Sequence, residues 1–146
     1  MMKQNTAPQL PSGVFYLMTD LVRNRERELN EKLAGIGLTL PEWRILRIVH
    51  SYSEAIPMSI VIEHSQSDRT TIGRTVEKLV NKGWVQKLPA LGDKRAFLVR
   101  SLDAVEDVYS QAYEMVTTHD TDILCRLSEE ECALLASYLN KLQEGH

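Results

Sequence analysis

Apolar residues recur at intervals of three and four over most of this 146-residue chain, which is the period of amphipathic α-helices. Glycines, prolines and short polar runs separate these stretches and mark where each helix begins or ends. The pattern predicts six helices, at residues 12–35, 39–53, 57–64, 68–83, from 103 onward and 128–142. A mainly α fold is therefore expected.

The period changes after Gly83. Residues 84–88 and 96–100 predict two short strands, and the segment 89–95, which contains proline and glycine, predicts the loop between them. A β-hairpin is thus expected directly after the fourth helix.

Two helix starts carry side chains suited to capping. The carboxylate of Asp68 can accept the free backbone N–H groups of Thr70 and Thr71. Ser128 begins the sequence SEEE, which predicts a capping box with Glu131. Both features place the start of a helix at the following residue.

A short helix, a polar turn, a second helix and a β-hairpin follow one another between residues 57 and 100. This is the order of elements in a winged helix-turn-helix, whose second helix enters the major groove of DNA. The predicted fold class is mainly α with a small β-hairpin wing, a winged helix-turn-helix flanked by N- and C-terminal dimerisation helices.

The sequences DRTTIGRTVEKLVNKGWV and GDKRAFLVR resemble the recognition helix and the wing of the MarR family of bacterial transcription regulators. The resemblance extends over the whole chain. It implies a single MarR-like domain, 1–146, in which residues 39–102 bind DNA and the helices at 12–35 and 103–146 form a homodimer. The matching residues are Asp68, Arg69, Thr70, Thr71, Ile72, Arg74, Leu79, Lys82, Gly83, Val85, Asp93, Lys94, Arg95 and Ala96.

The turn before the recognition helix departs from the family pattern. This chain has His64, Gln66 and Ser67 where the family usually has Leu, Gly and Leu, so a looser turn is expected. Two interpretations of His64 stay open, a ligand or pH sensor and a partly buried, hydrogen-bonded histidine, and we favour the second.

The residue types in this region suit contacts with DNA. We expect Arg74 to contact base edges, Arg95 to enter the adjacent minor groove, and Asp93 to hold the wing. Phosphates are expected to be neutralised by four lysines: Lys78, Lys82, Lys87 and Lys94. The candidate DNA contacts are Asp68, Arg69, Thr70, Thr71, Gly73, Arg74, Lys78, Lys94 and Arg95.

The charge distribution is compatible with this assignment. The formal net charge is -3, but residues 39–102 hold ten Lys/Arg and six Asp/Glu, a balance of +4. Residues 103–146 hold two Lys/Arg and ten Asp/Glu, a balance of -8. A basic middle suggests a nucleic-acid face, although charge alone does not distinguish it from an ordinary solvated surface.

The MarR resemblance implies a repressor that binds a palindromic site on double-stranded DNA as a dimer. It also implies release by a small effector, such as an aromatic acid or another phenolic, bound between the dimer and DNA-binding regions. Each candidate lining residue is equally well explained as a core or interface residue. The candidates are Tyr16, Arg23, Trp43, Arg47, His50, Tyr109 and Tyr113.

Other classes of function have weaker support. The spacing of Cys125 and Cys132 fits neither a zinc site nor a disulfide framework, so neither a metal nor a cofactor is expected. The chain shows no membrane span and no secretory signal, which predicts a soluble cytoplasmic protein. The alternative function is a winged-helix protein-interaction module without DNA binding. An enzyme is not expected, because no catalytic motif frames the possible cluster of His119, Asp120, Asp122 and Cys125.

Overall fold

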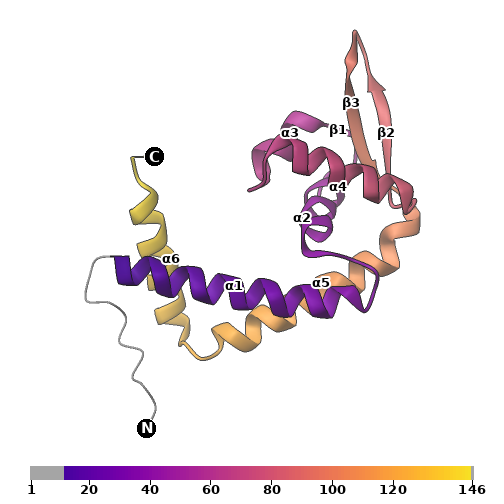
Figure 1. The fold of residues 1–146 in the computed structure, drawn as a ribbon. Helices are drawn as coiled ribbons and strands as arrows, with labels where there is room; N and C mark the ends of the chain where they lie inside the picture. Colours follow the sequence, from indigo (N-terminus) through magenta and orange to yellow (C-terminus); the bar gives the residue numbers. More distant parts are fainter. Residues whose placement is uncertain (1–11, 146) are drawn as a thin grey trace. The chain divides into compact units, whose positions relative to one another are not determined.

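The computed structural model describes residues 12–145, without the side chains of Ser12 and of residues 93–95. The described chain forms two compact units, which divide between Ala112 and Tyr113 inside helix α5. The elements in order (Figure 1) are α1 (Ser12–Ala34), α2 (Leu40–His50), β1 (Ile56–Pro57), α3 (Met58–His64), α4 (Arg69–Asn81), β2 (Val85–Ala90), β3 (Asp93–Ser101), a 3-10 turn (Asp103–Val105), α5 (Glu106–Leu124) and α6 (Glu129–Gln143). The predicted mainly α class is confirmed.

Helix α2 is central to the first unit. It contacts α1, α3, α4 and β3, and its residues Leu46 and Val49 are fully buried. Leu29 and Leu33 of α1 are also fully buried, and their spacing of four places them on one helix face. The core of this unit therefore follows the predicted helical period.

Side-chain caps fix three helix starts. The carboxylate of Asp68 caps α4, and Ser128 forms the capping box with Glu131 at the start of α6, so both predictions are confirmed. A further capping box starts α2, where Thr39 accepts from the backbone of Glu42 and the Glu42 side chain accepts from the backbone of Thr39. Each cap satisfies N–H groups that the first helical turn leaves free.

The sheet has the strand order β1-β3-β2 and is antiparallel. The predicted loop of the hairpin is too long, because β2 and β3 extend to a turn at Leu91 and Gly92. Pro89 lies within β2 opposite Phe97. Because β2 is an edge strand, a residue whose N–H would point away from β3 needs no N–H for strand pairing. Gly92 supplies the turn with a φ of 84°. Strand β1 was not expected from the sequence.

Two predicted helix boundaries are wrong. Helix α2 ends at His50 rather than near Ser53, and the side chain of Ser51 donates to the carbonyl of Ile48 there. Pro57 belongs to β1 and precedes α3 instead of starting it. The segment after α2 leaves the helical path because Ile56 and Pro57 pair with Val99 and Leu98 of β3.

Candidate nucleic-acid interface

Helices α3 and α4 are joined by the polar turn Ser65–Ser67, and the cap on α4 defines where the second helix begins. The Oδ1 atom of Asp68 accepts the backbone N–H of Thr71 over 2.8 Å. That hydrogen bond is the main cause that lowers the pKa of the Asp68 carboxyl below its ordinary value. A negative charge at this end also complements the helix dipole.

Helix α4 has two distinct faces. Its inner face packs into the first unit through Ile72, Thr75, Val76 and Leu79, all of which are buried. Gly73 is half-buried, and a side chain there would meet no atom within 4 Å. The other predicted contacts at the helix start and along α4 are all exposed: Asp68, Arg69, Thr70, Thr71, Arg74 and Lys78.

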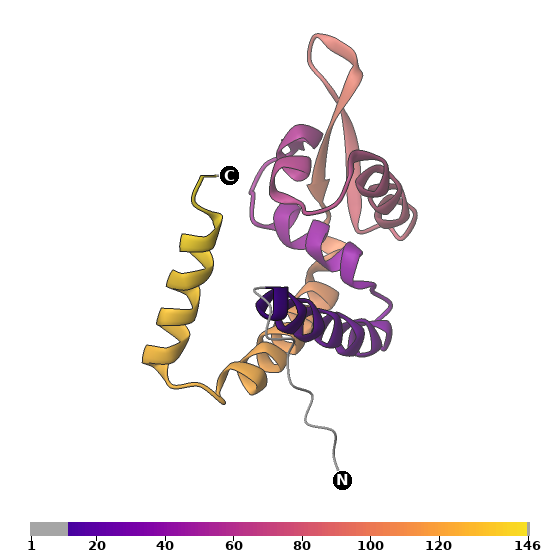
Figure 2. The ribbon, with the colours of Figure 1, turned by 60° about the vertical axis from the view of Figure 1, so that its left-hand side comes forward.

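The wing projects beyond α3 and α4 in both views of the first unit (Figure 2). Lys94 and Arg95 fall in β3, within three residues of the glycine at the hairpin turn. Their side chains, and that of Asp93, lie outside what the structure describes. The backbone of these three residues thus belongs to the outer part of the wing.

Lys82, for which a phosphate contact is expected, makes three short contacts within the protein. Its Nζ lies 2.7 Å from Oε2 and 2.9 Å from Oε1 of Glu42, and it donates to the carbonyl of Gly37 over 2.7 Å. The Glu42 side chain is only 1% exposed. This ion pair links the end of α4 to the start of α2.

Lys87, another lysine predicted to contact phosphate, also forms an ion pair within the protein. Its ammonium forms an ion pair with Glu77 of α4 and lies 4.0 Å from the ring centroid of Phe97. The pair connects the wing to the recognition helix. Neither Glu42 nor Glu77 could be predicted as a lysine partner from spacing in the sequence.

Three predicted effector residues lie together. The rings of His50 and Tyr109 stack with centroids 3.6 Å apart, and Trp43 lies 5.2 Å from Tyr109. The Oε1 atom of Glu106, a residue for which no role was predicted, lies 3.0 Å from Nε2 of His50. This cluster joins α2 to the first turns of α5.

The other predicted effector residues are more dispersed. Tyr16 and Arg23 are exposed on α1, and Tyr113 is exposed in the second unit. Arg47 lines a cavity together with Trp43, so these two alone among the seven candidates contribute to it.

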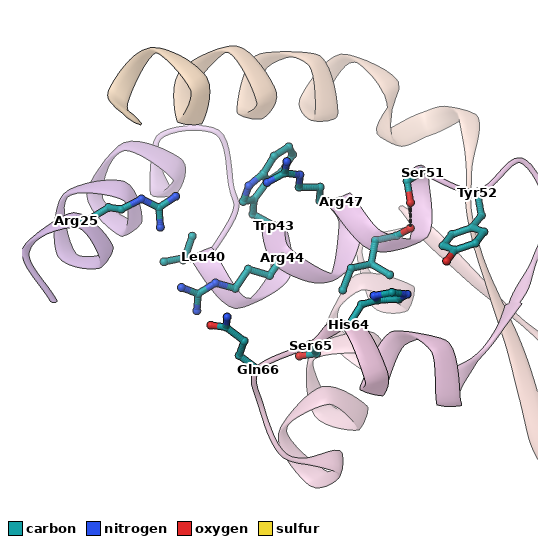
Figure 3. Close-up of a pocket in the computed structure, with 11 residues that line it drawn as sticks. Arg25, Leu40, Trp43, Arg44, Arg47, Ser51, Tyr52, His64, Ser65 and Gln66 are labelled. Carbon is teal, nitrogen blue, oxygen red and sulfur yellow. Dashed lines mark hydrogen bonds between the residues drawn. The ribbon is translucent and has the colours of Figure 1, made fainter. Parts of the chain in front are cut away.

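That cavity has a volume of about 530 Å³ and lies between α1, α2 and the turn before α4 (Figure 3). His64, which lines it, is exposed, so our interpretation of a partly buried histidine is wrong. The turn leaves this ring on the surface because the inward position of α3 is taken by Val61. The lining residues are Arg25, Leu40, Trp43, Arg44, Arg47, Ile48, Ser51, Tyr52, His64, Ser65 and Gln66.

Metal binding and membrane insertion have no support in the part of the chain that the structure describes. Residues 12–145 contain no cluster of three His, Cys, Asp or Glu side chains able to hold a metal ion. His119 is buried with its Nδ1 3.7 Å from Asp120, while Cys125 is exposed with its Sγ 3.2 Å from the carbonyl of Asp122. No helix among the described residues is long and apolar enough to cross a membrane.

The order and geometry of α3, α4 and the β2–β3 hairpin define a winged helix-turn-helix protein. Residues 38–97 match the model of the MarR family. The multiple antibiotic resistance protein MarR of Escherichia coli strain K12 is 26% identical over 134 residues, which cover 91% of each chain.

Solved structures extend the likeness to the flanking helices. A mutant MarR from E. coli in complex with operator DNA has a TM-score of 0.78 at 24% identity, over 97% of this chain and 99% of that chain. MepR of S. aureus in complex with DNA has a TM-score of 0.83 at 14% identity, over 90% and 96%. The predicted resemblance to the MarR family is confirmed over residues 38–97, and the chain shares the winged-helix fold of these solved structures.

Proposed function

We propose that this chain is a sequence-specific DNA-binding transcription regulator, which acts in the cytoplasm as a homodimeric repressor and is released by a small effector. The observation that carries the proposal is the exposed face of α4. It presents Thr70, Arg74 and Lys78, while the opposite face is buried, and Arg69 is exposed at the capped helix start. Hydroxyl, guanidinium and ammonium groups on one helix face are the groups that bind base edges and phosphates.

Relatives support the same partner. The E. coli MarR structure contains operator DNA, and the S. aureus MepR structure contains DNA. This chain shares their winged-helix fold over nine-tenths or more of its length. We therefore assign double-stranded DNA as its ligand.

Exposed apolar side chains support the homodimer. Helix α6 has no buried residue, yet five of its large hydrophobic residues are exposed. Monomers rarely expose apolar patches of this kind, and a second copy of the chain would cover them. These residues are Leu134, Leu135, Tyr138, Leu139 and Leu142.

The experiment is a titration of the purified protein against the intergenic DNA beside its own gene and against random DNA. Wild type is expected to prefer the intergenic fragment, with an affinity that falls as salt rises. Arg74→Ala should lose about five- to 150-fold in affinity for that fragment, because a bidentate base contact is worth about 1–3 kcal/mol. Arg95→Ala should also weaken binding, because it removes the side chain that is expected to enter the minor groove.

Arg126→Ala is the matched control. Arg126 is exposed in the second unit, and its removal changes the net charge as the other two substitutions do. Its affinity should equal that of wild type. Equal affinity of the wild type for both DNAs would contradict sequence-specific binding, and no binding to either DNA would favour a protein-interaction module.

A further inference from the structure

We propose that Leu91, at the tip of the wing, is a further DNA contact and packs between the sugars that wall the minor groove. This inference rests on the proposed function, because it requires the wing to lie against DNA. The contact would add apolar burial to an interface whose other predicted side-chain contacts are all polar or charged.

The tip of the wing is apolar. Residues 89–92, Pro-Ala-Leu-Gly, close the hairpin without a charged or hydrogen-bonding side chain, whereas hairpin turns usually carry Asn, Asp or Ser. Leu91 is 103% exposed, so it is not needed for the core. A single exposed leucine is ordinary on a protein surface, so the assignment depends on where this one lies and on its neighbours.

The turn carries Leu91 at the outermost point of the hairpin. Ala90 pairs with Asp93, which leaves Leu91 and Gly92 as the two residues of the turn. The φ of 84° at Gly92 is a conformation that glycine adopts without strain. The hairpin extends away from α4 in both views of the first unit (Figures 1 and 2). Leu91 therefore lies where the wing would first meet the groove next to the one that α4 enters.

Contacts near the base of the wing hold this tip in position relative to α4. Lys87 of β2 forms an ion pair with Glu77 of α4, and its ammonium lies 4.0 Å from the ring centroid of Phe97 in β3. Leu91 follows four residues later, about 13 Å farther along the hairpin at about 3.3 Å per residue. Helix α4 and Leu91 are thus placed to occupy neighbouring grooves of one duplex.

The residues beside the tip favour DNA as its partner. Lys94 and Arg95 follow Leu91 within four residues, and they outnumber Asp93, the one acidic residue of this segment. The minor groove is about 6 Å wide, which admits a side chain but no helix. Proteins that bind there combine Arg or Lys with apolar side chains such as Leu. An apolar protein or lipid surface would leave the cationic pair without a partner.

The first test measures affinity for the intergenic fragment at several salt concentrations. Leu91→Ser should weaken binding about tenfold for each wing, as expected when a leucine loses part of its apolar contact. The slope of log affinity against log salt should stay that of wild type, because an apolar side chain releases no counterion. Lys94→Ala should lower this slope. Leu91→Met, which keeps an apolar side chain of similar size, should bind like wild type.

The second test locates the contact by hydroxyl-radical cleavage of the saturated complex, because this radical attacks sugars in the minor groove. Wild type and Leu91→Met should protect the sugars at the flanks of the site, where the wings would lie. Leu91→Ser should lose this protection and keep the protection over the half-sites that α4 occupies. Wild-type affinity of Leu91→Ser, or unchanged protection at the flanks, would overturn the contact and leave the proposed function intact. If the wild-type protein does not prefer the intergenic fragment to random DNA, the proposed function fails, and this contact fails with it.

Discussion

Lys82 shows how a basic residue next to the recognition helix can serve folding rather than DNA binding. Its ammonium lies between the carboxylate of Glu42 and the carbonyl of Gly37, while the same carboxylate accepts the backbone N–H of Thr39. Because Glu42 is almost fully buried, removing the lysine leaves a buried charge with one backbone donor. The pair therefore holds α4 against the α1–α2 connection.

We expect Lys82→Met to lower the free energy of unfolding by roughly 2 kcal/mol, below the 3–5 kcal/mol typical of fully buried pairs, because about a third of the Lys82 side chain is exposed. Lys78→Met, one turn earlier on the exposed face, should stay within about 0.5 kcal/mol of wild type. Urea denaturation followed by circular dichroism measures both. Equal loss in the two variants would show that the Glu42 pair does not stabilise the fold.

The sequence could predict side-chain roles only where partners are close in the chain. The Asp68 cap was predictable because its acceptor and donor lie three residues apart. Lys82 and Glu42 are 40 residues apart, and Lys87 and Glu77 are ten apart on different elements. Such pairs arise from tertiary packing, so residue type and spacing could not distinguish these lysines from DNA contacts.

Periodicity located all six α-helices of residues 12–145, while the sheet was predicted less accurately. Strand β1 is two residues long, which is too short to show an alternating pattern. The first strand of the hairpin was expected to end at residue 88, but strand pairing continues through Pro89 because β2 is an edge strand. The cavity was missed because its lining comes from three separate segments.

Lys78 of α4 and Lys87 of β2 should differ in how much each contributes to the salt dependence of DNA binding. Lys78→Ala should reduce the slope of log affinity against log salt by about 0.9 for each protomer, as expected for one lost phosphate contact. Lys87→Ala should leave the slope unchanged, because its ammonium is held by Glu77 and the ring of Phe97. Titrations at four salt concentrations measure both slopes. A slope reduced only in Lys87→Ala would reverse this assignment.

The whole molecule combines a basic winged region with an acidic C-terminal third. Residues 39–102 carry a balance of +4, and residues 103–146 carry -8. The acidic third includes α6, whose apolar side chains are exposed. This division suits a protein that binds phosphate with one region and a second copy of itself with another.

Two copies of this chain are expected to bind a two-fold symmetric DNA sequence, and selection of bound sites from random duplex DNA can reveal that symmetry. Wild type should enrich a palindrome whose half-sites lie about 10 base pairs apart. Leu139→Glu should yield a monomer by light scattering and lose this enrichment, while Asn140→Glu, a neighbouring exposed position, should keep it. If the wild-type protein enriches no sequence, or a single asymmetric site, it does not bind DNA as a symmetric dimer.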